Sequence, residues 1–118
     1  MRKFTLLLAL ASVTFAAPAA ATGGLNCRTA GARPIEVVVG FGHGFGAPLF
    51  LSRLSDDGKD VKVSAPQWWL DPSEVRLLLF APGAHRQELE LRATRKGAFY
   101  DGLVWRNGRK RWVRCRED

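Results

Sequence analysis

The sequence predicts an all-β protein, a small antiparallel barrel or sandwich that a disulfide between its two ends closes. Short apolar and β-branched runs alternate with turn signals roughly every 8–12 residues, a spacing typical of such folds. One run, Glu88–Arg95, alternates strictly between polar and apolar residues. Two cysteines, Cys27 and Cys115, stand near the ends of the chain. No pattern typical of a helix follows residue 21, and we expect six or seven strands.

The first 21 residues are expected to be a signal peptide rather than part of the fold. Arg2-Lys3 supplies the basic start, and Phe4–Ala17 is an uncharged run of 14 residues. That run is shorter than the roughly 20 residues that a membrane-spanning helix needs. Small residues, Ala19–Ala21, follow a proline. We therefore expect cleavage after Ala21, with Ala17 and Ala20 as alternative sites. The protein is then periplasmic or secreted, with one domain over residues 22–118.

Charge and size limit the function. Loss of the signal leaves 16 basic against 11 acidic residues, a net charge of +5. A single small domain excludes large multi-domain enzymes and multi-span transporters. A basic surface favours an anionic partner. Because the protein is expected outside the cytoplasm, that partner is an anionic cell-envelope polymer or membrane surface, with no nucleic acid expected; a protein partner stays unknown.

Cys27 and Cys115 are the only cysteines and stand 88 positions apart. In an oxidising compartment an even count favours a disulfide. The loop-entropy relation gives about 4.5 kcal/mol for closing a loop of that size. The bond requires the first and last strands to be neighbours. A redox-active pair is disfavoured because no C-x-x-C motif is present.

The first half of the chain carries these strand signals. Ile35–Val39 is short and β-branched, as strands are. Leu49–Leu54 is apolar and ambiguous. The turn cluster Ser55–Asp60 leads into Val61–Val63, which alternates. Two prolines then bracket the stretch Gln67–Asp71.

The second half is more regular. Val75–Phe80 is an apolar strand that ends at a proline and a glycine. In Glu88–Arg95, leucines and an alanine face one side, so this is a half-buried antiparallel strand. Its opposite side carries Glu88 and Glu90, which we interpret as solvated charges, like Asp56-Asp57 in the preceding turn cluster. Expected core residues are Val37, Val39, Val63, Leu77, Leu79, Leu89, Leu91, Val104 and Val113.

Phe99–Trp105 and Trp112–Cys115 are expected to form a hairpin. Asn107-Gly108 between apolar runs is the strongest short-range signal for one. With these two residues as the turn, Leu103 faces Trp112 and Trp105 faces Lys110. A bulged turn would shift that register by one.

Glycine occupies every second position from Gly40 to Gly46. In a strand, this places Phe41, His43 and Phe45 on one face and bare backbone on the other, against which an indole can pack. A mobile loop beside a ligand site is the alternative. A dinucleotide-binding loop is disfavoured because no helix follows.

No catalytic arrangement is visible. His43 and His85 are far apart in sequence, and a zinc site needs three or four ligands. No serine stands in a nucleophile motif. We therefore expect no enzyme, no metal, no cofactor and no catalytic residue. The alternative in the enzyme class is a minor envelope hydrolase with His43 or His85 as base.

Trp68-Trp69 is the first candidate binding element. Adjacent residues of an extended segment point to opposite faces, so one indole enters the core and the other emerges. An emerging tryptophan can stack on a sugar or on a partner's side chain. Covering one end of a barrel is the structural alternative.

The carboxy-terminal hairpin is the second candidate. Six basic residues and no acidic one lie between Arg106 and Arg116. Basic residues interleaved with aromatic ones are typical of contact with an anionic polymer or a headgroup layer. A solubilising hairpin tip is the alternative. The candidate contact residues are Trp105, Arg106, Arg109, Lys110, Arg111, Trp112 and Arg114.

The chain resembles a group of small exported bacterial proteins of unknown function that have a terminal cysteine pair. The resemblance rests on Phe99–Leu103 (Phe-Tyr-Asp-Gly-Leu), Asn107-Gly108, Val113–Cys115 (Val-Arg-Cys) and Cys27. It implies a short β-domain and no catalytic residue. The architecture also looks somewhat like the small periplasmic β-barrel inhibitors of c-type lysozyme, which makes an inhibitor-like protein-binding module an alternative. The chain departs from those inhibitors in charge, since it would repel a strongly basic lysozyme.

Overall fold

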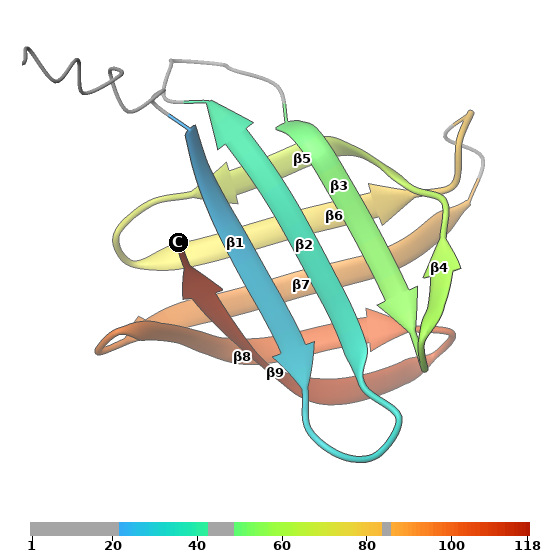
Figure 1. Cartoon of the computed structure of the whole chain (residues 1–118). Helices are drawn as coiled ribbons and strands as arrows, with labels where there is room; N and C mark the ends of the chain where they lie inside the picture. Colours follow the sequence, from blue (N-terminus) through green and yellow to red (C-terminus); the bar gives the residue numbers. More distant parts are fainter. Residues whose placement is uncertain (1–21, 43–48, 84–85) are drawn as a thin grey trace, which may run out of the picture.

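The computed structural model describes residues 22–42, 49–83 and 86–118. It is all-β, a single antiparallel sheet curled into a half-barrel (Figure 1). Nine strands cross the sheet in the order β4-β3-β2-β1-β9-β8-β7-β6-β5. Their bounds are β1 Thr22–Thr29, β2 Ile35–Gly42, β3 Leu49–Asp56, β4 Lys59–Val61, β5 Ser64–Leu70, β6 Glu74–Phe80, β7 Gln87–Lys96, β8 Phe99–Arg106 and β9 Arg109–Glu117.

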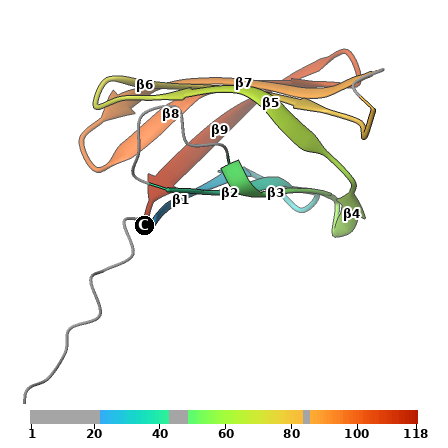
Figure 2. The same ribbon diagram turned by 90° about the horizontal axis from the view of Figure 1, so that it is seen from above.

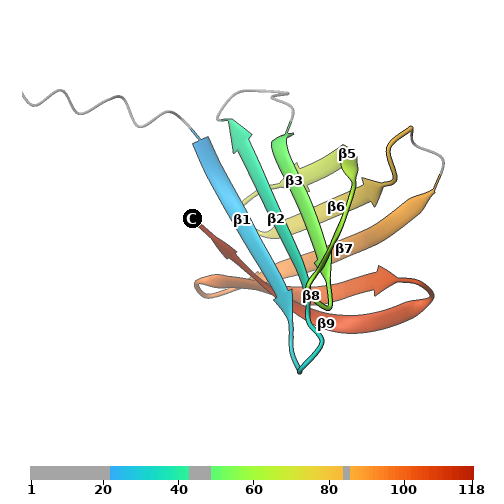
Figure 3. The ribbon, with the colours of Figure 1, turned by 45° about the vertical axis from the view of Figure 1, so that its right-hand side comes forward.

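The curl folds the sheet into two layers. Strands β1 to β4 form one layer, β5 to β8 form the other, and β9 passes from one to the other (Figure 2). The strands of one layer run across those of the other (Figures 1 and 3). The core fills the space between the layers.

The sequence underestimates the number of strands. Instead of the expected six or seven strands, the described residues contain nine, because Thr22–Thr29 and Ser64–Leu70, which contains Pro66, are also strands. The first contains two glycines and an asparagine, which have low strand propensity. Tertiary pairing on both sides overrides that preference.

The disulfide joins two residues that lie directly opposite each other. Cys27 of β1 and Cys115 of β9 are register partners, and their Cα atoms are 3.9 Å apart. The first and last strands are therefore neighbours, as the disulfide requires. The bond fits an oxidising, exported environment.

The β8–β9 hairpin has the expected register. Leu103 lies opposite Trp112, and Trp105 lies opposite Lys110. Asn107 and Gly108 both have positive φ, 51° and 73°. This combination is the two-residue turn whose twist matches that of the strands, so no bulge shifts the pairing.

Eight of the nine residues expected in the core are buried. The ninth, Val63, is half-buried and packs against the core. Tyr100 is the largest fully buried side chain, and its hydroxyl donates to the carbonyl oxygen of Asp71 at 2.9 Å. The residues that the sequence did not place in the core are Leu25, Cys27, Ile35, Phe41, Leu54, Val75, Ala93, Tyr100 and Cys115.

The half-barrel keeps two edge strands, β4 and β5. Both edges are unsuited to pairing with another chain. The first is only three residues long. The second contains Pro66, around which its register with β6 shifts. No helix long and apolar enough to cross a membrane occurs in the described ranges.

Part of the glycine-rich segment lies within β2. Phe41 is buried, and the Trp68 indole packs on its ring with centroids 5.4 Å apart. Phe41 lies opposite Gly23 of β1, and its ring covers the backbone of that glycine. A Cβ at Gly23 would lie 2.5 Å from the Phe41 ring. Residues 43–48 lie outside the described residues, as do 84–85 and the expected signal peptide.

Candidate functional site

The outward side of β9 is exposed to solvent. Val113 and Cys115 point into the core, so the residues that alternate with them, Trp112, Arg114 and Arg116, point outward. Trp112 is 74% exposed, the highest value among the large apolar side chains that the structure describes. We call the outward side chains of β9 and the adjoining arginine of β1 the β9 face: Lys110, Trp112, Arg114, Arg116 and Arg28.

Arg106 does not belong to an exposed basic patch, which corrects the sequence-based expectation. Its side chain is 10% exposed and is enclosed by two carboxylates. Its Nε donates to Asp56 Oδ2 at 2.7 Å, and its Nη1 donates to Glu88 Oε2 at 2.8 Å. The fold thus uses Arg106 in two ion pairs, which leaves its guanidinium unavailable as a contact group.

Glu88 was expected to be a solvated charge and is buried instead. Hydrogen bonds from Arg106 and then Arg86 hold the pKa of Glu88 below its usual range, although burial acts in the opposite direction. The cause lies in the β6–β7 register. Leu79 faces Leu89 but Phe80 faces Gln87, so Glu88 is an extra residue in a β-bulge. A bulge turns a side chain away from the face that simple alternation assigns to it.

Arg111 is also used by the fold. Its Nη1 donates to the carbonyl oxygen of Arg33 and its Nη2 to that of Ala30, both at 2.8 Å. It therefore fastens the loop between β1 and β2 to β9. Arg109 lies exposed at the hairpin tip. Trp105 is half-buried and lies opposite Glu90 in the β7–β8 register.

Arg114 is held flat against β8. Its Nε and Nη2 donate to the two oxygens of Asp101 at 2.8 and 3.0 Å, and its guanidinium lies 4.5 Å from the centre of the Phe99 ring. The Asp101 hydrogen bond raises the pKa of Arg114. The guanidinium is therefore a fixed cation beside the exposed indole of Trp112.

Arg28 is the residue of this site that sequence reasoning missed. It lies directly opposite Arg114 in the β1–β9 register, and it pairs with Glu36 at 2.8 Å. The cysteine pair could have indicated this position. If Cys27 faces Cys115 in antiparallel strands, the residue after Cys27, Arg28, must face the residue before Cys115, Arg114.

The β9 face borders a broad open hollow of about 940 Å³. Three basic side chains line it, Arg28, Arg114 and Arg116, and Glu36 and Asp101 pair with the first two of them. Within the described ranges, Lys110 and Arg116 have no acidic partner. The lining residues include Arg28, Phe99, Trp112, Arg114 and Arg116.

Trp68 and Trp69 point to opposite faces, as expected. Trp68 packs against the core, whereas Trp69 is 51% exposed on the outer face of β5. Cross-strand pairing places Trp69 and Trp112 in one row over five strands. That row runs Trp69, Arg76, Arg92, Leu103, Trp112.

Among the residues that the structure describes, no group of three or more His, Cys, Asp or Glu side chains is arranged to hold a metal ion. Both histidines, His43 and His85, lie outside the described residues. Comparison of the chain with protein-family models, curated proteins and solved structures finds no match.

Proposed function

We propose that this chain is an exported, non-catalytic binding protein of the cell envelope, periplasmic or secreted, that holds an anionic envelope polymer on the β9 face. The observation that carries the proposal is the excess of cations beside the exposed Trp112: Arg28 and Arg114 are paired with carboxylates, whereas Lys110 and Arg116 have no acidic partner in the described ranges. A phosphate or carboxylate supplies the missing counter-charge, and guanidinium groups bind such anions bidentately.

A polymer fits this face better than a membrane surface does. Interfacial binding strengthens with the apolar area that enters the bilayer. Trp112 is the one large exposed apolar side chain of the β9 face, so little area is available. An indole flanked by cations instead suits a chain that offers both an apolar surface and repeated charges.

The test uses protein purified from the exported fraction. Retention on heparin resin and co-sedimentation with phosphatidylglycerol vesicles compare a polymeric anion with a lipid one. Arg28→Glu/Arg116→Glu removes two cations of the face, and Lys59→Glu/Lys62→Glu makes the same change of charge in β4 and at the residue that follows it. We expect only the first variant to lose retention, and binding to weaken as salt shortens the screening length.

Equal loss in both variants would mean that binding follows net charge alone. Retention of the Arg28→Glu/Arg116→Glu variant at the wild-type salt concentration would place the polymer elsewhere. Tighter binding to vesicles than to heparin would favour the membrane surface. Each of these results contradicts the proposal.

A further inference from the structure

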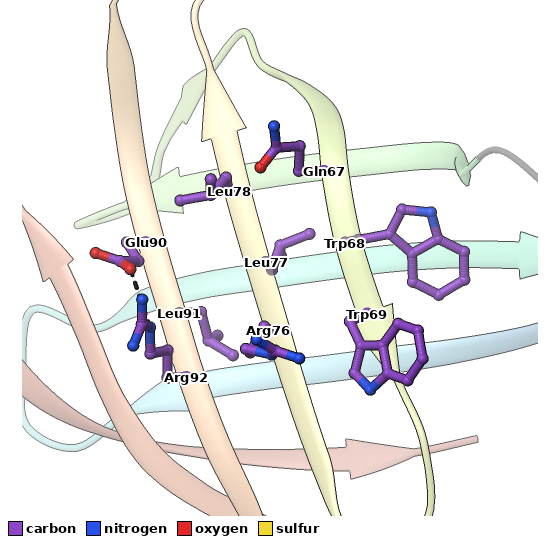
Figure 4. A pocket seen from close by; sticks show the side chains of 9 residues that line it. All are labelled: Gln67, Trp68, Trp69, Arg76, Leu77, Leu78, Glu90, Leu91 and Arg92. Carbon is purple, nitrogen blue, oxygen red and sulfur yellow. Dashed lines mark hydrogen bonds and ion pairs between the residues drawn. The ribbon is translucent and has the colours of Figure 1, made fainter.

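A second hollow, of about 250 Å³, lies on the outer face of β5, β6 and β7, away from the β9 face. The Trp69 indole stands on one side of it and the Glu90–Arg92 ion pair on the other, with Arg76 and Leu78 between them (Figure 4). The buried Leu77 and Leu91 occupy the opposite face of the same strands.

Trp69 is held in place by its hydrogen bond to Asp71. The indole Nε1 donates to Asp71 Oδ2 at 2.7 Å. The other oxygen, Oδ1, accepts from the backbone N and the hydroxyl of Ser73, both at 2.7 Å, and from the backbone N of Glu74 at 2.9 Å. These bonds, the Ser73 hydroxyl first, lower the pKa of Asp71. A ring fixed in this way loses little freedom when a ligand stacks on it.

The opposite side of the hollow offers hydrogen-bonding groups with planar, bidentate geometry. Arg92 Nε donates to Glu90 Oε1 at 3.0 Å, and Arg76 Nη2 lies 3.2 Å from Glu74 Oε1. In the part of the chain that is described, the Nη atoms of Arg92 have no further partner. Gln67 adds an exposed amide at the rim. The hollow therefore combines the Trp69 ring and the apolar side chain of Leu78 with hydrogen-bond donors and acceptors around them.

The charges of the hollow cancel, which distinguishes it from the β9 face. Arg76 and Arg92 face each other across β6 and β7, and each is paired with a carboxylate two residues away on its own strand. A neutral ligand is therefore favoured over an anion. The volume is below the roughly 300 Å³ at which sites for larger ligands begin, so a single small ring fits.

We propose that the Trp69 hollow binds a neutral hexopyranose unit. Such a ring presents one face of C–H groups, which stacks on an indole, and a rim of hydroxyls that both donate and accept hydrogen bonds. Arg92, Glu90 and Gln67 supply the complementary groups.

The hexopyranose can be a free sugar or one unit of a glycan chain. The position of Trp69 relative to Trp112 predicts a different affinity pattern for each. Trp69 and Trp112 are four strand spacings apart in one row, about 19 Å along the sheet. A glycan of several units seated at Trp69 thus extends over β7 and β8 towards the β9 face. A longer oligosaccharide then binds more tightly than the monosaccharide, whereas a site for free sugars shows no such gain.

The experiment is a chemical-shift titration of ¹⁵N-labelled exported protein with glucose, maltotriose, N-acetylglucosamine and its trimer. We expect at least one probe to shift the Trp69 indole N–H signal saturably at millimolar concentration. Trp69→Ala should weaken that binding about tenfold, the loss typical of an important interface side chain. Trp69→Phe, which keeps an aromatic ring, should weaken it less. Trp112→Ala, also an exposed indole, should leave the monosaccharide affinity unchanged.

No saturable shift at Trp69 with any of the four probes would overturn the inference, as would unchanged binding by Trp69→Ala. Heparin retention, measured on the same variants, keeps this test separate from the proposed function. If Trp69→Ala is retained on heparin like the wild type, the proposal for the β9 face stands independently of the result of the sugar titrations.

Discussion

Glu88 and Arg106 form a buried ion pair, with Arg106 Nη1 2.8 Å from Glu88 Oε2 and side chains that are 5% and 10% exposed, respectively. The same guanidinium reaches Asp56 at the end of β3. Arg106 therefore connects the β7–β8 layer to the β1–β4 layer at the end of the hairpin. This connection explains why the most basic segment of the sequence presents fewer free charges than its composition indicates.

Glu88→Gln should lower the free energy of unfolding by about 3 kcal/mol, because removing one partner leaves a buried charge incompletely compensated. Denaturant unfolding measures the change. Glu90→Gln is the matched control, since Glu90 pairs with an exposed arginine two residues away. It should cost at most about 1 kcal/mol. Equal losses in the two variants would contradict a structural role for the buried pair.

Stability should also fall in acid through Glu88. Its pKa in the folded protein is lowered from an ordinary value of 4.5, chiefly by Arg106 and then by Arg86. Its contribution is therefore fully present above pH 4.5 and is lost as the pH falls through the folded-state pKa. Between neutral pH and about pH 3, the wild type should lose more stability than Glu88→Gln. Parallel pH profiles of the two proteins would rule this out.

The local features of the fold were predictable from the sequence, and the long-range ones were less so. The Asn107-Gly108 turn fixes the hairpin register because both residues tolerate positive φ. The bulge at Glu88 was not predictable, since its partner Arg106 lies on another strand and only the folded sheet brings them together. Arg28 is intermediate: its position opposite Arg114 follows once the disulfide is assigned, although no local pattern singles it out.

Gly102→Ala should destabilise the protein by about 2 kcal/mol through overpacking. A Cβ at Gly102 would collide with the carbonyl oxygen of Arg92 and lie 2.5 Å from the Cα of Ala93, and backbone atoms cannot move aside locally. At Gly24, the nearest atom to an added Cβ is a carboxylate oxygen of Asp118, 3.3 Å away at the end of a flexible side chain. Gly24→Ala should therefore stay within about 0.5 kcal/mol of the wild type. Thermal unfolding of both variants decides; similar losses would refute the packing explanation.

Cys27→Ala/Cys115→Ala should cost about 4.5 kcal/mol, because the disulfide closes a long loop and restricts the unfolded chain. Urea unfolding of the double variant and of the wild type gives the difference. Intact mass of the exported protein, after alkylation without reductant, should correspond to residues 22–118 with no modified thiol. Two alkylated cysteines would contradict the disulfide in the cell, and retention of Met1 would contradict cleavage after Ala21.

Chemical-shift mapping with soluble heparin is the most direct test of binding at the β9 face. The Trp112 indole N–H and the Nε–H groups of Arg28 and Arg116 should shift saturably, and the shifts should diminish as salt is added. The backbone signals of Lys59 and Lys62, equally basic but remote, should not move. Shifts spread evenly over all exposed lysines and arginines, or confined to the hairpin tip around Arg109, would contradict binding at the β9 face.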